Sequence, residues 1–150
     1  MFRANAHDRL SDFDVGTLAA DVLRQNDVLY EKITATLECV RDEVQIAFEE
    51  VLRFLFLVAS HDSGQLTPSH RVDLVWHEFI LCTRVYDEFC ETHFGRMIHH
   101  HPGGERERHR RQYEETLRLY KHFFGQPHQR FWPDARSRLT GANCGACETV

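Results

Sequence analysis

The chain has 150 residues, of which 42% are hydrophobic, and its formal net charge is −5. This length fits one domain with a sizeable core, and the acidic balance argues against a nucleic-acid-binding protein. The longest apolar run, 54–59, is far shorter than the roughly 20 residues of a membrane span, so we expect no membrane partner either.

The cysteine and histidine contents are both unusual. Five cysteines are an odd number, and residues 1–8 contain no apolar signal core. We therefore expect a cytoplasmic protein with reduced thiols. The chain also has eleven histidines, and because each would add one positive charge, full protonation would change the net charge from −5 to +6.

The first half of the chain predicts three helices after a flexible N-terminal segment, 1–13. The stretch 14–25 carries apolar residues at helical spacing and acidic residues near its start. A second helix is expected from Asp27 and a third from Asp42. Because residues 27–60 contain neither glycine nor proline, these two helices are also compatible with one bent helix.

The stretch 68–94 is predicted to be a central helix. Thr67 followed by Pro68 is a helix-entry signal, and Gly95 stands where a left-handed C-terminal cap is expected. Apolar residues surround this helix on nearly every side, which is typical of a buried helix. We therefore expect the imidazole of His77 to lie in the protein interior, where it needs a partner.

Three consecutive histidines follow the central helix. Because the residue before Pro102 is pushed to extended geometry, His99, His100 and His101 are expected on a short return segment, on alternating sides. A last amphipathic helix then runs from the Gly-Gly pair at 103–104 to a glycine at 125.

The end of the chain has two recognisable features. An aromatic clasp at 131–133, Phe-Trp-Pro, is expected to dock on the core. Residues 136–150 form a small-residue, flexible tail that contains two cysteines. Together these patterns predict an all-α protein with one compact domain, 14–135, of about five helices around the buried helix at about 68–94.

The first candidate site combines an acid with histidines. Asp73 lies four residues before His77, on the same helical face, where its carboxylate can hold the imidazole in one tautomer. An extended return from Gly95 brings His100 roughly 16 Å back, about 10 Å short of His77, a gap that two side chains meeting at a metal can roughly span. The alternative is a core histidine bonded to Asp73 and a backbone carbonyl.

We therefore expect a Zn²⁺ or Fe²⁺ site that uses His77 and one or both of His99 and His100 as ligands, with Asp73 as the orienting partner. No nucleotide cofactor is expected. His77-Glu78 also begins the zincin pattern, but a leucine, Leu81, stands where that pattern needs its second histidine. This departure excludes a zincin metalloprotease.

The second candidate site is the pair Cys144 and Cys147. Their spacing suits a redox disulfide or half of a zinc site. The βαβ context of a thioredoxin-type motif is absent, which favours half of a metal site or a tail that faces a protein partner.

The stretch VDLVWHEFILCTRVYDEFCETHFGRMIHHHP, followed by YEETLRLYKHFFG and the aromatic clasp, resembles short bacterial proteins of the glycine-rich-domain-containing-protein-like family, whose domain also occurs in plant glycine-rich proteins. The resemblance covers about residues 45–135. Many members have a second histidine two residues after Trp-His, where this chain has Phe79. The resemblance implies motif positions at Asp73, Trp76, His77, Tyr86, Cys90, Gly95, His99, His100 and Pro102.

Three functions are compatible with these patterns. The leading hypothesis is a cytoplasmic metal-binding protein, and an open coordination position would allow hydrolytic or oxygen chemistry on a substrate that the sequence does not name. The alternative is a non-enzymatic interaction module whose histidines are structural and whose partner is another protein. A weaker alternative is thiol redox chemistry through the C-terminal cysteine pair.

Overall fold

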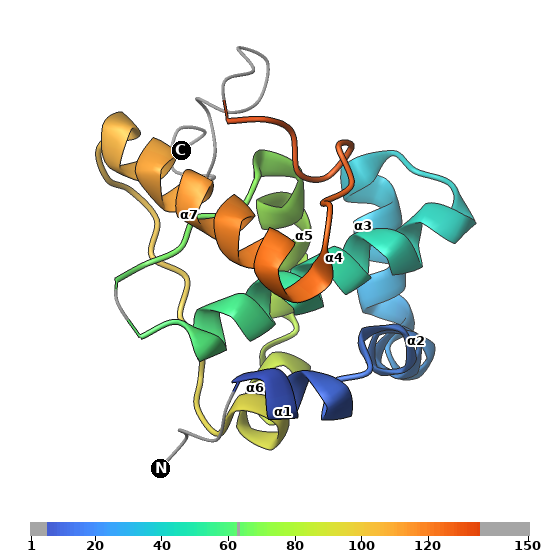
Figure 1. Ribbon diagram of the computed structural model, residues 1–150. Helices are drawn as coiled ribbons and strands as arrows, with labels where there is room; N and C mark the ends of the chain where they lie inside the picture. The colour runs from blue at the N-terminus through green and yellow to red at the C-terminus, as the bar shows by residue number, and fades with distance from the viewer. Residues whose placement is uncertain (1–5, 63, 136–150) are drawn as a thin grey trace.

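The computed structural model describes residues 6–62 and 64–135, which form seven α-helices and no strand (Figure 1). The all-α class predicted from the sequence is confirmed, with seven helices where about five were expected. None of the described helices combines the length and the apolarity that a membrane crossing requires. The helices are α1 (Ala6–Asp12), α2 (Val15–Gln25), α3 (Asp27–Leu37), α4 (Arg41–Ser60), α5 (His70–Leu81), α6 (Thr83–Phe94) and α7 (Arg106–Phe124).

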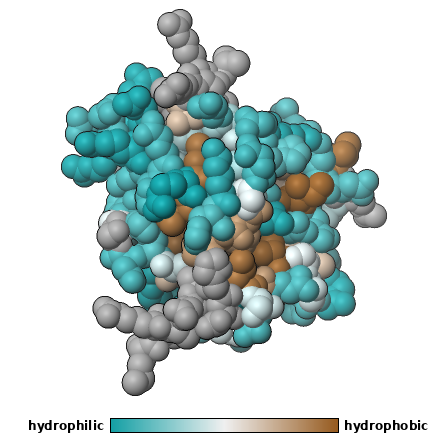
Figure 2. All heavy atoms as spheres, viewed as in Figure 1, coloured by the Kyte–Doolittle hydropathy of each residue, from teal (hydrophilic) through white to brown (hydrophobic). Residues whose placement is uncertain are grey.

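Helix α4 lies at the centre of the packing. It contacts α2, α3, α5 and α7, and α7 crosses in front of it in Figure 1. Phe48, Leu52 and Leu55 of α4 are completely buried. Helix α5 packs against α3, α4 and α6, so the predicted central segment shares the interior with α4. In Figure 2 the visible face is mostly hydrophilic, with patches of apolar side chains near its middle.

The stretch 68–94 is two helices, which corrects the prediction of a single one. Cys82, between α5 and α6, has φ −82° and ψ 64°, values outside the helical region. Its N–H still bonds to the carbonyl of Phe79, three residues back, so the last turn of α5 tightens before the chain leaves the helix. Gly95 ends α6 in the left-handed conformation, as predicted.

The start of α5 also differs from the prediction. Ser69, and not Thr67, is the N-cap, because its Oγ accepts a hydrogen bond from the Val72 N–H at 3.1 Å. The Thr67 hydroxyl instead donates to Gln112 Oε1 of α7 at 2.8 Å. Thr67 therefore ties the loop before α5 to α7.

Two other boundaries are settled by the structure. Helices α3 and α4 are separate, because Glu38 adopts φ 50° and ends α3.

Part of the segment 1–13 predicted to be flexible is helix α1. Phe13 directly after it is buried, with its ring 5.3 Å from that of Phe56 and 5.7 Å from that of Phe94. This burial gives the N-terminal helix an apolar anchor on the core.

The aromatic clasp docks on the core, as predicted, through a buried acid that the sequence did not reveal. Trp132 is completely buried, and its Nε1–H donates to Glu50 Oε2 at 2.6 Å. The Tyr120 hydroxyl donates to the same oxygen at 2.8 Å, and Arg53 binds the other carboxylate oxygen. Three donors thus compensate the burial of the Glu50 carboxylate.

Candidate metal centre

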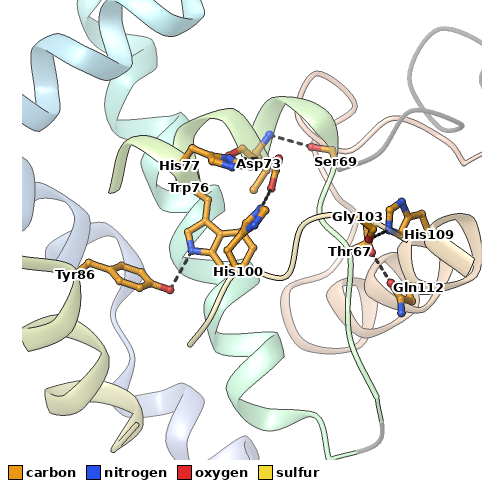
Figure 3. Close-up of polar contacts among 11 residues, drawn as sticks. Thr67, Ser69, Asp73, Trp76, His77, Tyr86, His100, Gly103, His109 and Gln112 are labelled. Atoms are coloured by element: carbon orange, nitrogen blue, oxygen red, sulfur yellow. Dashed lines mark hydrogen bonds and ion pairs between the residues drawn. The ribbon is translucent and has the colours of Figure 1, made fainter. Parts of the chain in front are cut away.

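Two segments bring an acid and two histidines together. Helix α5 presents Asp73 and His77 one turn apart, and the return segment 96–101 places His100 against them (Figure 3). One ligand atom from each of the three side chains lies within 4.8 Å of the other two. We call Asp73, His77 and His100 the triad.

Within the triad, Asp73 contacts both histidines, and the two histidine rings contact each other. His100 Nε2 lies 2.8 Å from Asp73 Oδ1. His77 Nδ1 lies 3.4 Å from Asp73 Oδ2 and 2.8 Å from the Asp73 backbone oxygen. The His77 and His100 ring centroids are 4.3 Å apart. One carboxylate therefore lies between two imidazoles.

Burial within the triad differs from the sequence-based expectation. The His77 side chain, expected in the interior, is 41% exposed, whereas that of His100 is 13% exposed and that of Asp73 is completely buried. A carboxylate removed from water needs a compensating charge or hydrogen-bond donors. Within the triad, Asp73 is therefore the residue whose burial the neighbouring side chains must compensate. Its predicted role was to orient His77, and its position also makes it a candidate ligand.

His99 lies outside the triad. Side chains of the return segment alternate, as predicted: Ile98 is buried and His100 is largely covered, whereas His99 and His101 are exposed. The rings of His99 and His101 are 6.5 Å apart, which places them on a common side. The structure thus brings together two of the three predicted histidine ligands.

Tyr86 of α6 fixes the return segment against α5. Its hydroxyl donates to the Ile98 backbone oxygen at 2.5 Å and accepts from Trp76 Nε1–H at 3.1 Å. The Trp76 ring in turn lies 4.7 Å from the ring of His100. Burial raises the pKa of Tyr86, so the phenol stays protonated and remains a donor. Tyr86 and Trp76 are positioning residues for His100.

A second contact holds the chain just after the return segment. His109 of α7 is buried, and its Nε2 lies 2.9 Å from the Gly103 backbone oxygen. Gly104 has φ +124°, and a Cβ at this position would lie 2.8 Å from His109 Nε2. The residue after Gly103 must therefore be a glycine for His109 to reach this carbonyl.

A cavity of about 210 Å³ lies beside the triad, between the return segment, the loop before α5 and the start of α7. Asp73 and His100 line it, and His77 does not. The other lining residues are Val58, His61, Gly64, Gln65, Leu66, Thr67, Pro68, Trp76, Arg96, Ile98, His99, His101, His109 and Gln112.

The triad offers two imidazole nitrogens and one carboxylate. Ligands about 2 Å from a shared ion lie about 3–4 Å apart, so a spacing within 4.8 Å requires only a small inward movement of the side chains. Three protein ligands leave coordination positions open, unlike the four of a structural zinc site. This arrangement suits an ion that also binds an external molecule.

Sequence reasoning missed the residues that surround the cavity. Arg96, His61, His109 and Gln112 come from three distant segments, and no local spacing connects them. The thiol pair Cys144 and Cys147 lies outside the described residues. Cys39, Cys82 and Cys90, which are described, are free thiols.

A family model described as UCP032817-like matches residues 19–139 of the chain. This match corrects the resemblance over about residues 45–135 to the glycine-rich-domain-containing-protein-like family, which no comparison shows. No curated protein and no solved structure matches the chain.

Proposed function

The chain belongs to the UCP032817-like family, and we propose that it is a metal-binding protein whose Zn²⁺ or Fe²⁺ site is formed by Asp73, His77 and His100. The observation that carries this proposal is the convergence of two imidazoles on one completely buried carboxylate. A divalent cation would compensate that charge and use all three donors at once.

The donor set indicates the class of metal. Two histidines and one carboxylate with open positions are typical of non-haem Fe²⁺ sites, and a similar set binds catalytic Zn²⁺. His77 Nδ1 lies 2.8 Å from the Asp73 backbone oxygen, a type of contact that in metal sites holds a histidine ring in one orientation. An open position would allow hydrolytic or oxygen chemistry. We place the protein in the cytoplasm, where its free thiols would remain reduced.

One observation favours a second candidate, an interaction module with structural histidines. The 2.8 Å contact between His100 and Asp73 already provides the carboxylate with a partner and joins the return segment to α5. In that case the triad holds the fold together and binds no ion. The two candidate functions therefore predict different metal contents for the protein.

The test is equilibrium dialysis of the full chain against Zn²⁺ and, under anaerobic conditions, Fe²⁺, followed by elemental analysis. We expect one ion per chain, retained in His99→Ala and lost in His77→Ala and His100→Ala. His99 is the matched control because it neighbours His100 and lies outside the triad. A Cys144→Ser/Cys147→Ser variant should keep its metal. Equal metal in every variant, or none in the unaltered chain, contradicts the proposal.

A further inference from the structure

The cavity beside the triad has one acidic group and many nitrogen donors. Among the described residues that line it, Asp73 is the only carboxylate, whereas Arg96, Gln112 and four histidines besides His100 offer N–H groups. A metal held by the triad would add two positive charges next to the single negative charge of Asp73. The electrostatics therefore favour an anion.

Two of these donors are held by contacts with other residues of the cavity lining. Arg96 donates one N–H to the Val58 backbone oxygen at 3.5 Å, and a guanidinium has five such groups. Gln112 accepts from Thr67 Oγ1 through its amide oxygen, which leaves its NH₂ group to donate. A planar guanidinium matches the geometry of a carboxylate, which it can bind through two parallel hydrogen bonds.

The volume and the apolar wall limit the ligand further. A volume of about 210 Å³ corresponds to about seven water molecules at about 30 Å³ each, which is below the range of drug-sized ligand sites. This volume therefore favours a small ligand. Leu66, Pro68, Trp76 and Ile98 form an apolar part of the lining, which suits a short hydrocarbon chain.

We propose that this cavity binds a small organic carboxylate with a short apolar chain, and that one carboxylate oxygen completes the coordination of the metal held by Asp73, His77 and His100. This inference rests on the proposed function. Asp73 and His100 belong both to the triad and to the cavity lining, so an open position of the ion would face the ligand.

The test uses the full chain loaded with Co²⁺, whose visible absorption changes when its ligands change. Acetate, butyrate and inorganic phosphate are titrated at constant ionic strength. We expect saturable spectral changes with both carboxylates and about tenfold tighter binding of butyrate, because its two extra CH₂ groups contact the apolar wall. Phosphate binding as tight as that of butyrate, or equal affinity for acetate and butyrate, overturns the proposal.

A pair of arginine variants tests the position of the ligand. Arg96→Gln should weaken butyrate binding about tenfold, by the loss of charge-assisted hydrogen bonds. Arg84→Gln is the matched control, because Arg84 is exposed and lies outside the cavity. Equal weakening in both variants overturns the assigned site. A chain that takes up no Co²⁺ contradicts the proposed function as well, whereas a loaded chain without a spectral response contradicts this inference alone.

Discussion

His100 Nε2 lies 2.8 Å from Asp73 Oδ1, although the two residues are 27 positions apart in the sequence. This contact joins the return segment to α5, and the whole of α6 lies between the two in the sequence. Its acidic partner is completely buried, so the contact supports both the fold and the candidate metal centre.

The two histidines of the triad should contribute unequally to the stability of the metal-free protein. His100→Ala removes the 2.8 Å contact of the buried Asp73 carboxylate with His100, and we expect a loss of about 3–5 kcal/mol in the free energy of unfolding. His77 is 41% exposed, so His77→Ala should cost at most about 1 kcal/mol. Urea denaturation with a chelator present measures both values. Similar losses for the two variants would contradict the assignment of the buried pair.

A metal that binds only the folded chain should raise its melting temperature. At a free metal concentration of 100 Kd the expected stabilisation is about 2.7 kcal/mol, which corresponds to roughly 5–10 °C for a chain of this size. Calorimetry with Zn²⁺ and with Mg²⁺ measures the shift. Imidazole ligands favour Zn²⁺, whereas Mg²⁺ favours oxygen ligands. We therefore expect only Zn²⁺ to raise the melting temperature. An equal shift in Asp73→Asn would show that the ion binds elsewhere.

Tyr86 should affect metal affinity without touching the metal. Tyr86→Phe removes the hydrogen bonds to Ile98 and Trp76 that hold the return segment, so we expect a loss of about 1–3 kcal/mol in stability and weaker metal binding. Tyr113→Phe is the matched control, because it removes a hydrogen bond to Pro133 and none to the return segment. The control should lose stability and keep its metal affinity. Unchanged affinity in Tyr86→Phe would contradict the positioning role.

Stability should also fall in mild acid, partly through His93. Burial lowers the pKa of His93, whose ring lies 4.4 Å from that of Phe89. The unfolded chain therefore binds this proton more readily than the folded chain, so the stabilisation is present at neutral pH and declines as the pH falls below about 6.5. Urea denaturation between pH 7 and pH 5 should give a shallower pH dependence for His93→Phe. Identical slopes would contradict this assignment.

Local sequence patterns predicted most of the helices. Apolar periodicity located α2, α4 and α7, and Gly95 marked the end of α6 because a left-handed cap favours glycine. The break at Cys82 was missed, because no glycine or proline marks it. Ser69 and Thr67 are both hydroxyl residues before the same helix, and only the observed contacts distinguish the cap from the tie to α7.

The candidate site was only partly accessible to sequence reasoning. The spacing of Asp73 and His77 and the alternation along the return segment follow from local geometry. Which charges are buried depends on partners distant in the chain: Asp73 is covered by His100, and Glu50 by Tyr120 and Trp132. The expected separation of His77 and His100 also assumed one straight helix over 68–94, which the break at Cys82 removes.

The most direct test of the metal centre is X-ray absorption spectroscopy at the K-edge of the bound ion, with the full chain loaded with Zn²⁺ or Fe²⁺. The proposed site requires two imidazole ligands and one carboxylate oxygen at about 2.0–2.2 Å, and His77→Ala should give no such spectrum because it loses the ion. A sulfur shell at about 2.3 Å, or a spectrum that His77→Ala leaves unchanged, would contradict it.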